Sequence, residues 1–407
     1  YSDDGRPANP IRLMVGILLL KQIENLSDED VVVQWKRNPY YQYFCGENEL
    51  QIKEPCHSTD LVYFRKRIGT EGMKVIFGMS ISLHGKDAEE SQVIVDTTVQ
   101  ENNITYPTDG KLAIKIINHL HKMAKEEKIQ LRRTYMKEIK GHRISLRFFR
   151  HPRKIKKARS AMKRLKTIAK TLIRDLDRNF TGEQQEKYAE KLYLYMRILL
   201  QEKGSKNKIY SLHESHAYAV GKGKDHKKWE YGTKASLVTT KKSGIIIGVC
   251  AHEKNEHDSK TLEAALTSAN SNRTKPIKEA ICDRGYVGKK EVLNTTISLP
   301  GVPLKRDTKY QKEQKREKFR RRAAIEPIIG HVKSDHRMKI NYLKGFIGDE
   351  MNLLLAASAF NLKKWMNNFI QLIILLRLTL LTTALQQQKH EDRQKYEKLF
   401  LLLFRLW

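Results

Sequence analysis

The sequence predicts an α/β protein in which helices come first and a long helical segment interrupts a sheet. Three observations support this prediction. Residues 10–86 have the pattern of successive helices, residues 111–205 carry helical periodicity with little β signal, and short apolar segments that end in Asp occur near residues 91–96 and 279–283. Because strand patterns stand on both sides of residues 111–205, we interpret that stretch as an all-helical insertion into a sheet domain.

The N-terminal region carries several helix-start signals. Ser27 with Asp30 resembles a capping box, and Ser58–Thr59 and Thr70 can cap two later helices on either side of Gly69. A helical region of this kind suits a DNA-binding helix-turn-helix or a domain used for packing or dimerisation. The residues do not separate these two functions.

Two Asp residues each follow a short apolar strand pattern, and both are candidate site residues. Asp96 lies in Ser91–Thr98, and Asp283 lies in Lys278–Tyr286. A strand followed by Asp and a small or polar turn places a carboxylate at a sheet edge, where open α/β sheets bind ligands. Either Asp by itself is as easily explained as a turn former. The Asp283–Tyr286 block is the more specific of the two.

The remaining elements of the sheet domain are predicted from the same patterns. Pro107–Gly110 is a turn, so Asp109 is expected to have a structural role rather than to bind a metal. The strand near residues 91–106 is expected to be followed, after the insertion, by strands at 209–213, 229–240, 244–251 and 297–304, and by a helix from Asp258 to about Ala269.

The most informative pattern is a group of four residues, Phe319, Arg322, Glu326 and Lys333. On one helix they fall at i, i+3, i+7 and i+14, which brings them back to one face. A carboxylate between Arg and Lys suits a metal ligand beside phosphates, because the cations neutralise phosphate while the Glu holds a divalent ion. Pro327 follows the Glu directly, so the helix is expected to kink or begin there.

The stretch before Glu326, Lys309–Arg322, is basic and polar. We expect it to be a mobile segment that leads into the helix of Glu326. The spacing of the four residues also arises by chance on an ordinary basic amphipathic helix, so the motif requires support from other parts of the chain.

The charge of the chain gives independent support. Its net charge is +31, from 77 basic and 46 acidic residues, and a chain this basic is expected to bind nucleic acid. Gly141–Lys170 contains 12 Lys or Arg and no Asp or Glu. This stretch also contains large apolar residues, so it can fold. We therefore predict DNA contacts from Lys154, Lys156, Lys157 and Arg159, the alternative being a solvated basic face.

Cysteine usage and the C-terminal region bear on the cellular setting. The four Cys residues show no CxxC or Cys/His ligand spacing, which argues against zinc and is typical of a reducing cytoplasm. We expect a cytoplasmic location. Residues 367–407 form an apolar tail with a polar middle. A packed helix or a dimer contact explains it better than a membrane span, which needs about 20 apolar residues.

The motif of Glu326 resembles the Tyr-x2-Arg-x3-Glu-x6-Lys signature of bacterial insertion-sequence transposases with a DDE active site. Phe319 stands where the signature has Tyr, so the ring is kept and the hydroxyl is lost. The stretches Leu26–Val32 and Asn38–Gly46 resemble the N-terminal helical domain of the insertion sequence five family, and further similar stretches extend the resemblance over residues 10–366.

This resemblance implies a fold and a set of domains. An RNase H-like catalytic core is expected at residues 89–366, with the helical insertion at about 111–205. A helical N-terminal domain, residues 1–88, would bind the DNA ends, and residues 367–407 would follow as the tail.

The resemblance also implies a bacterial, nucleoid-associated location and an activity. Asp96, Asp283 and Glu326 would be catalytic and would bind two Mg²⁺ ions, for which Mn²⁺ can substitute. Such an enzyme binds the terminal inverted repeats of its element as a homodimer, cleaves DNA and joins the 3′ ends to target DNA. An RNase H-like nuclease or resolvase without strand transfer, and a non-catalytic DNA-binding relic, are the alternatives. Residues expected to contact DNA near the scissile bond are Phe319, Arg322, Lys333 and Arg284.

The basic insertion is expected to act in binding rather than in chemistry. Replacing Lys154, Lys156, Lys157 and Arg159 by Gln should flatten the slope of log affinity against log salt by roughly 0.9 for each phosphate that is no longer neutralised. Cleavage at saturating DNA should survive. Lys333→Ala should show the opposite pattern, a modest affinity loss with a large loss of single-turnover rate. An unchanged salt slope in the insertion variant would identify the segment as a solvated face.

Overall fold

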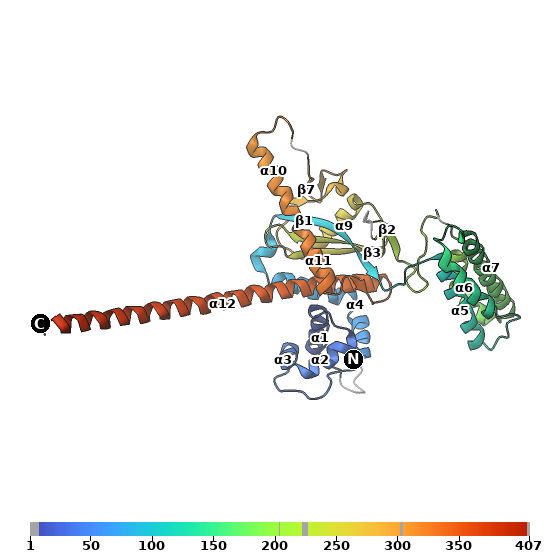
Figure 1. The fold of residues 1–407 in the computed structure, drawn as a ribbon, viewed down its shortest axis with the longest axis horizontal. Coiled ribbons are helices and arrows are strands. Elements are labelled where there is room, and N and C mark those ends of the chain that lie inside the picture. The colour runs from blue at the N-terminus through green and yellow to red at the C-terminus, as the bar shows by residue number, and fades with distance from the viewer. Residues whose placement is uncertain (1–7, 203, 222–226, 302–303, 405–407) are drawn as a thin grey trace. The chain divides into compact units, whose positions relative to one another are not determined.

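The computed structural model describes the backbone of residues 8–202, 204–221, 227–301 and 304–404, with side chains except those of Lys318 and residues 381–404. The chain divides into two compact units. One contains residues 1–89 and 355–407, and the other contains residues 90–354. The second unit thus ends at residue 354, whereas the resemblance implies a catalytic core that extends to residue 366. Figure 1 shows the elements of both units.

The first unit is helical, as predicted. Its elements are α1 (Ile11–Ile23), α2 (Asp28–Arg37), α3 (Pro39–Cys45), α4 (Ser58–Ser82), the short 3-10 helix η1 (Gly85–Glu89) and the greater part of α12 (Gly345–Phe404).

Local capping explains where these helices begin and bend. Ser27 caps α2, since its Oγ accepts a hydrogen bond from Asp30 N at 3.0 Å. Gly69, with φ of 60°, interrupts α4 as expected. The cap of α4 is His57 rather than Ser58–Thr59, because the His57 ring and Asp60 form a reciprocal capping box.

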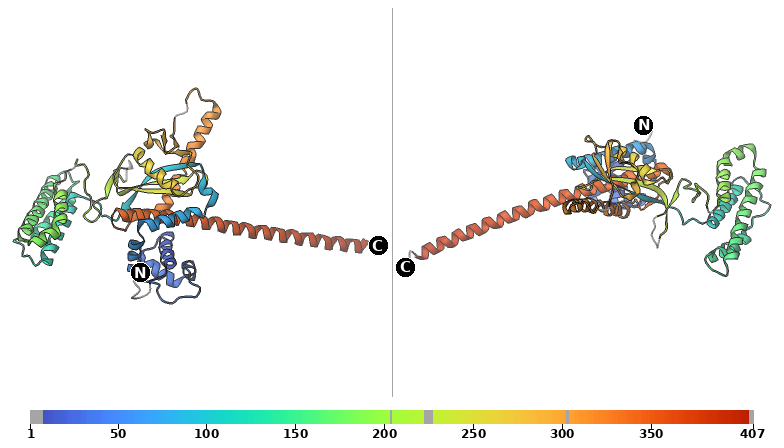
Figure 2. Two further views of the ribbon diagram at one scale, coloured as in Figure 1. Left: turned by 180° about the vertical axis from the view of Figure 1, so that it is seen from behind. Right: turned by 90° about the horizontal axis from the view of Figure 1, so that it is seen from above.

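Residues from the two ends of the chain meet within this unit. His84 Nε2 donates to Asn361 O at 3.1 Å, and Asn361 Nδ2 donates to Ser80 Oγ at 3.3 Å. α12 is drawn as one long helix in both views of Figure 2. Residues 351–359 of this helix are buried, whereas Ile347 near its start and the large apolar side chains from Phe369 to Leu380 are exposed. Among the helices in the described ranges, none is both long and apolar enough to cross a membrane.

The second unit contains a mixed sheet, which confirms the α/β class. Its strand order is β2-β3-β1-β5-β7-β6, with β4 paired to β3 and β8 paired to β1. β1 runs antiparallel to β3 and parallel to β5. The strands are β1 (Gln92–Asn102), β2 (Tyr218–Gly221), β3 (Trp229–Thr240), β4 (Ile246–His252), β5 (Glu279–Ile281), β6 (Glu291–Val292), β7 (Thr295–Ser298) and β8 (Ile340–Asn341).

Helix α9 (Asp258–Asn270) packs against β3 and β4. Gly248 permits this close approach, because a Cβ at that position would lie 2.7 Å from the Cβ of Ala269. The predicted start of this helix at Asp258 is confirmed.

Two strand predictions were wrong. Residues 209–213 are not a strand, because the Gln201 side chain accepts from Ile209 N and donates to Ile209 O, both at 3.0 Å. These bonds replace the ladder that a neighbouring strand would supply, and the strand forms later, as β2. Of the strand expected at 297–304, only the first part is present, as β7, which ends at Ser298, and residues 302–303 lie outside the described residues.

The stretch between β1 and β2 is helical, as the sequence predicted. It contains α5 (Asp109–Glu126), α6 (Met136–Ser145), the 3-10 helix η2 (Leu146–Phe148), α7 (Ile155–Asn179) and α8 (Gly182–Leu200), and Figures 1 and 2 show these helices side by side.

The helical insertion has a core of its own. One face of α7 supplies Leu165, Ile168 and Leu172 to this core, where they meet apolar residues of α5 and α8. Asp109 is structural, as expected, since it pairs with Lys208 at 3.1 Å and Lys166 at 3.5 Å.

A buried polar network joins the start of α12 to the sheet. The Asp349 side chain is fully buried and accepts hydrogen bonds from Asn341 Nδ2 at 2.7 Å, Asn102 Nδ2 at 2.9 Å and Thr233 Oγ1 at 2.5 Å. His216 Nε2 lies 2.8 Å from Asp349 Oδ2. Because a buried carboxylate is costly unless its oxygens are satisfied, this network fixes β1, β3, β8 and α12 against one another.

The network predicts a pH-dependent stability. The hydrogen bond to Asp349 raises the pKa of His216 above 6.5; burial opposes the rise, and the charges of Asp349 and Glu214 add to it. The pair therefore stabilises the fold fully below the pKa of the unfolded histidine and loses this contribution as pH rises through the folded pKa. His216→Gln should lower the free energy of unfolding most below about pH 6 and much less near about pH 9.

Urea unfolding across this pH range measures the effect. The matched control is His151→Gln, at an exposed histidine of the insertion, which should leave the pH profile unchanged. A loss of stability in His216→Gln that is constant with pH would contradict an ionised pair.

Candidate active site

The parallel pairing of β1 with β5 brings the two predicted Asp residues to one level of the sheet. Ile94 stands opposite Ile281, and continuing that register by two residues places Asp96 beside Asp283. Each carboxylate is held by a local backbone donor. Asp96 Oδ1 accepts from Thr97 N at 2.8 Å, and Asp283 Oδ1 accepts from Gly285 N at 2.8 Å as it caps the 3-10 helix η3 (Arg284–Tyr286).

Arg322 lies between Glu326 and Asp96. Its guanidinium lies 3.8 Å from Asp96 Oδ2 and 3.5 Å from Glu326 Oε1. The Asp96 side chain is 18% exposed and the Glu326 side chain 64% exposed. The structure therefore brings Asp96, Arg322 and Glu326 together, but Glu326 faces solvent and reaches Asp96 only through the guanidinium.

The signature residues lie on two helices rather than one. Phe319 and Arg322 belong to α10 (Lys309–Arg322), and Glu326 and Lys333 belong to α11 (Ile325–Asp335). The single-helix prediction was wrong, because the helical run breaks at Ala323–Ala324. Pro327 lies in the first turn of α11, where a missing N–H is tolerated. The expectation that the helix begins near Pro327 was correct.

The basic stretch before Glu326 is not an irregular segment. It forms α10, whose Thr308 cap and Gln311 make a reciprocal capping box. The prediction of a mobile segment overlooked this cap. Eight of the 14 residues of α10 are Lys or Arg, and such a composition resembles a solvated linker when periodicity alone is considered.

A third Asp, Asp258, was not predicted as a site residue. Its Oδ1 accepts from Thr97 Oγ1 at 3.0 Å and lies 3.1 Å from Lys234 Nζ. Its Oδ2 faces Asp283 across Gly285, where a Cβ would lie 3.0 Å from Asp258 Oδ2 and 2.9 Å from Asp283 Oδ1. An Asp in the first turn of a helix usually serves the helix itself, so no sequence signal marks its place in the site.

The carboxylates create a strongly negative environment. Burial, followed by the charges of Asp283 and Asp96, raises the pKa of the Cys282 thiol well above its ordinary value. The pKa of Tyr286 rises for the same reasons, with Asp258 among the charges that act on it. Burial is the larger cause of both shifts, and the carboxylate charges add to it.

The donor set suits a hard divalent cation, since every candidate ligand is a carboxylate oxygen. The absence of a Cβ at Gly285 leaves room between two of these carboxylates. Within the described part of the chain, however, no three His, Cys, Asp or Glu side chains are close enough to hold a metal ion together. The residues fit a metal in chemistry, and Glu326 would have to turn inward to complete the set.

The remaining predicted DNA contacts lie in two places. Arg284 is exposed at the start of η3, directly after Asp283, whereas Lys333 and Phe319 are half-buried on α11 and α10. The four basic residues of the insertion are exposed around the N-terminus of α7, and they are Lys154, Lys156, Lys157 and Arg159.

Comparison with known proteins places this site in a family. Residues 1–67 match the family "Transposase domain (DUF772)", and residues 203–362 match the family "Transposase DDE domain". A protein of Rhizobium meliloti, the uncharacterised ORF8 product of the nfe locus, is 40% identical over 158 residues, which is 38% of this chain and 76% of that protein. The chain belongs to the DDE transposases of insertion sequences. The second match contains Asp283 and Glu326, while Asp96 lies outside both matches.

No solved structure matches the transposase. The insertion sequence five family is compatible with both matches and remains a prediction. Asp96 lies on β1, before the helices α5 to α8, whereas the matched DDE domain begins after them at residue 203.

The space at Gly285 yields a prediction about divalent ions. In Gly285→Ala the new methyl group would displace the carboxylate of Asp283 or Asp258. Binding of Mn²⁺, followed by the electron paramagnetic resonance signal of the free ion, should weaken about 10–100-fold, as for other changes that misplace metal ligands.

Gly330→Ala is the matched control, because a Cβ there meets nothing within 4 Å. Unchanged Mn²⁺ affinity in Gly285→Ala, with an unchanged melting temperature, would remove Asp258 and Asp283 from the candidate metal site.

Proposed function

We propose that the transposase binds the ends of its element, cleaves DNA there and joins the freed 3′ ends to target DNA. The observation that carries this proposal is the level placement of Asp96, on β1, and Asp283, two residues after the end of the parallel strand β5, with Arg322 linking Asp96 to Glu326. One Asp on a strand, a second just after a neighbouring parallel strand and a Glu on a helix are what the predicted RNase H-like core would require, and they support the proposal.

Asp96, Asp283 and Glu326 would hold the divalent cations, Mg²⁺ or Mn²⁺ in its place. Bound there, the ions supply Lewis acidity to the attacking and leaving oxygens of a phosphodiester. Asp258 would support the set by its position beside Asp283, since Lys234 and Thr97 already hold one of its oxygens.

Arg322 would act differently in the free and the DNA-bound enzyme. In the free protein its guanidinium offsets the charges of Asp96 and Glu326. A phosphate approaching three carboxylates is repelled unless cations intervene, and a guanidinium matches phosphate geometry well. We therefore assign Arg322 to the phosphate beside the scissile bond, with Lys333 and Arg284 as further contacts.

The chemistry requires two transfers at phosphorus. In the first, a water oxygen bonds to phosphorus and the 3′ oxygen of the element leaves as a hydroxyl. In the second, that hydroxyl bonds to a phosphorus of the target, loses its proton and displaces the target's 3′ oxygen. Carboxylates that face the reacting phosphate are suited to accept the proton lost in each step. A homodimer would process the two terminal inverted repeats together.

The proposal predicts the effect of removing each carboxylate. Asp96→Ala, Asp283→Ala and Glu326→Ala should each lower Mg²⁺-dependent cleavage of an end-bearing duplex at least about a hundredfold, or ~3 kcal/mol in the barrier. End binding should change little, because none of the three attracts phosphate. Single-turnover cleavage and equilibrium binding in Ca²⁺ measure the two effects.

Asp177→Ala, at an exposed Asp of α7, is the control and should cleave normally. Near-normal cleavage by one of the three variants would remove that residue from the site. A wild-type protein that cleaves but forms no joined product would be a nuclease or resolvase, and one that binds ends without cleaving would be a relic.

A further inference from the structure

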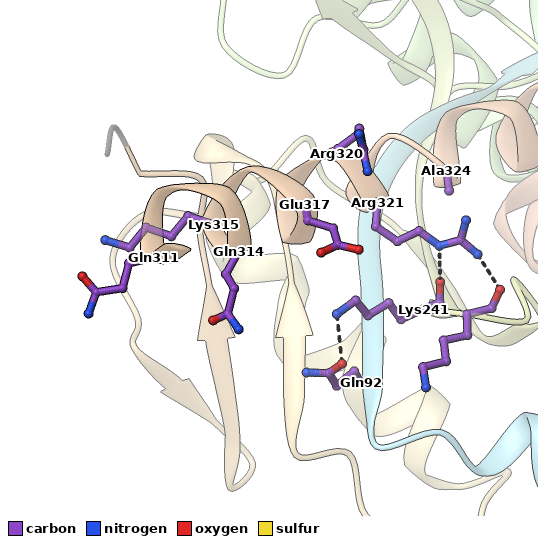
Figure 3. Close-up of a pocket in the computed structure, with 10 residues that line it drawn as sticks. Gln92, Lys241, Gln311, Gln314, Lys315, Glu317, Arg320, Arg321 and Ala324 are labelled. Carbon is purple, nitrogen blue, oxygen red and sulfur yellow. Dashed lines mark hydrogen bonds between the residues drawn. The ribbon is translucent and has the colours of Figure 1, made fainter. Parts of the chain in front are cut away.

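A groove of about 1110 Å³ lies between α10 and the turn that joins β3 to β4 (Figure 3). One wall is the face of α10 that carries Gln311, Gln314 and Lys315. The other wall is formed by Lys241 and Lys242 of the turn. None of the sequence patterns marked this groove, because its two walls are far apart in the chain.

The groove is strongly basic. Five of its lining side chains are cationic and one, Glu317, is acidic. Lys315 is paired with Asp307, at 2.7 Å. Among described residues the other four form no ion pair with a carboxylate, and Lys241 Nζ donates only to the neutral amide oxygen of Gln92, at 3.0 Å. The five cationic residues are Lys241, Lys242, Lys315, Arg320 and Arg321.

The turn that carries two of these lysines is fixed through its backbone. Glu90 accepts hydrogen bonds from Lys242 N at 2.7 Å and Ser243 N at 2.8 Å. From the opposite side Arg321 donates to Lys241 O at 3.0 Å and to Lys242 O at 2.6 Å, as the dashed lines in Figure 3 show. The conformation of the turn therefore rests on backbone hydrogen bonds that remain when the lysine side chains are neutralised, and a bound anion would meet a wall that is already ordered.

The dimensions of the basic surface favour a chain of phosphates over a single anion. Lys315 and Arg321 are six residues apart on α10, about 9 Å along the helix axis at 1.5 Å per residue. A row of cations of this length matches successive phosphates of a backbone better than one compact anion. The amides of Gln92, Gln311 and Gln314 add neutral donors and acceptors to the lining, which suits a backbone rather than one compact ion.

Two residues that line the groove are close in sequence to residues of the candidate active site. Gln92 lies on β1 four residues before Asp96, and Arg321 directly precedes Arg322, which pairs with Asp96. A strand held in the groove would thus be led toward the carboxylates. We propose that this groove binds the phosphodiester backbone of the DNA strand that runs to the scissile phosphate. The inference rests on the proposed function for the identity of that strand.

The test neutralises the turn lysines without altering its backbone. Lys241→Gln with Lys242→Gln should flatten the slope of log affinity against log salt by roughly 0.9 for each phosphate left without its lysine, measured on a DNA duplex in Ca²⁺. The control neutralises Lys289 and Lys290, an exposed lysine pair of the same unit outside the groove, and should leave the slope unchanged. Equal melting temperatures establish that both variants fold.

A second measurement locates the contact on DNA. Single phosphates of an end-bearing duplex are replaced in turn by neutral methylphosphonate. The wild type should lose affinity when phosphates on one side of the scissile position are replaced. The Lys241→Gln, Lys242→Gln variant should show no further loss of affinity when the same phosphates are replaced, because it has already lost the contacts to them. An unchanged salt slope, or equal methylphosphonate losses in both proteins at every position, overturns the proposal.

These outcomes are separable from failure of the proposed function. If the wild type cleaves and joins DNA while the groove variant keeps its salt slope, the groove inference fails and the function stands. Suppose instead that the wild type does not cleave DNA, while the groove variant has a flatter salt slope and lacks the methylphosphonate effects. The groove then binds DNA and the catalytic assignment fails.

Discussion

Strand β1 pairs antiparallel with β3 from Val93 to Glu101 and in parallel with β5 from Gln92 to Ile94. Its first residue, Gln92, lines the basic groove, and Asp96 stands in its middle. Its C-terminal end, which pairs with β8, supplies Gln100 and Asn102 to the buried network of Asp349. A slip of β1 by one residue would turn each of these side chains to the other face of the sheet, so one strand register controls the groove, the site and the network together.

Charge balance is the second constraint on the site. Asp96, Asp258 and Asp283 gather where Cys282 and Tyr286 are buried, and the pKa values of both neighbours rise. Cations offset this charge from two sides, Lys234 at Asp258 and Arg322 at Asp96 and Glu326. In the proposed enzyme, divalent ions and DNA phosphates would enter in place of these ion pairs. Arg322 is the group best placed to move between carboxylate and phosphate.

The helical insertion is stabilised by packing within itself. Its helices bury their apolar faces against each other, so a long segment can stand between β1 and β2 without taking core residues from the sheet. The basic residues at the start of α7 then remain exposed on a folded surface rather than on a flexible loop. Charge held on an ordered surface is more effective in binding, because less side-chain and backbone entropy is lost when the ligand arrives.

The sequence by itself determined the features that depend on neighbouring residues. It predicted the Ser27 cap, the interruption at Gly69, a helical stretch over residues 111–205, the α/β class and the transposase family. Periodicity and capping are local, so a linear pattern is enough to reveal them.

The candidate carboxylates were found in the same way, since Asp96 and Asp283 each follow a strand pattern. Their shared level on the sheet, however, is a property of the β1–β5 pairing that no local pattern contains.

The contacts between segments that are distant in sequence were decided only by the tertiary structure. Asp258 joins the site through a hydrogen bond to a residue 161 positions away, and the groove brings the β3–β4 turn to α10 through Arg321. The strand expected at 209–213 was lost because Gln201 satisfied the backbone of Ile209 instead. Contacts between distant segments form when burial and hydrogen bonding together outweigh the entropy of closing long loops, and that balance depends on the whole fold rather than on any single stretch of sequence.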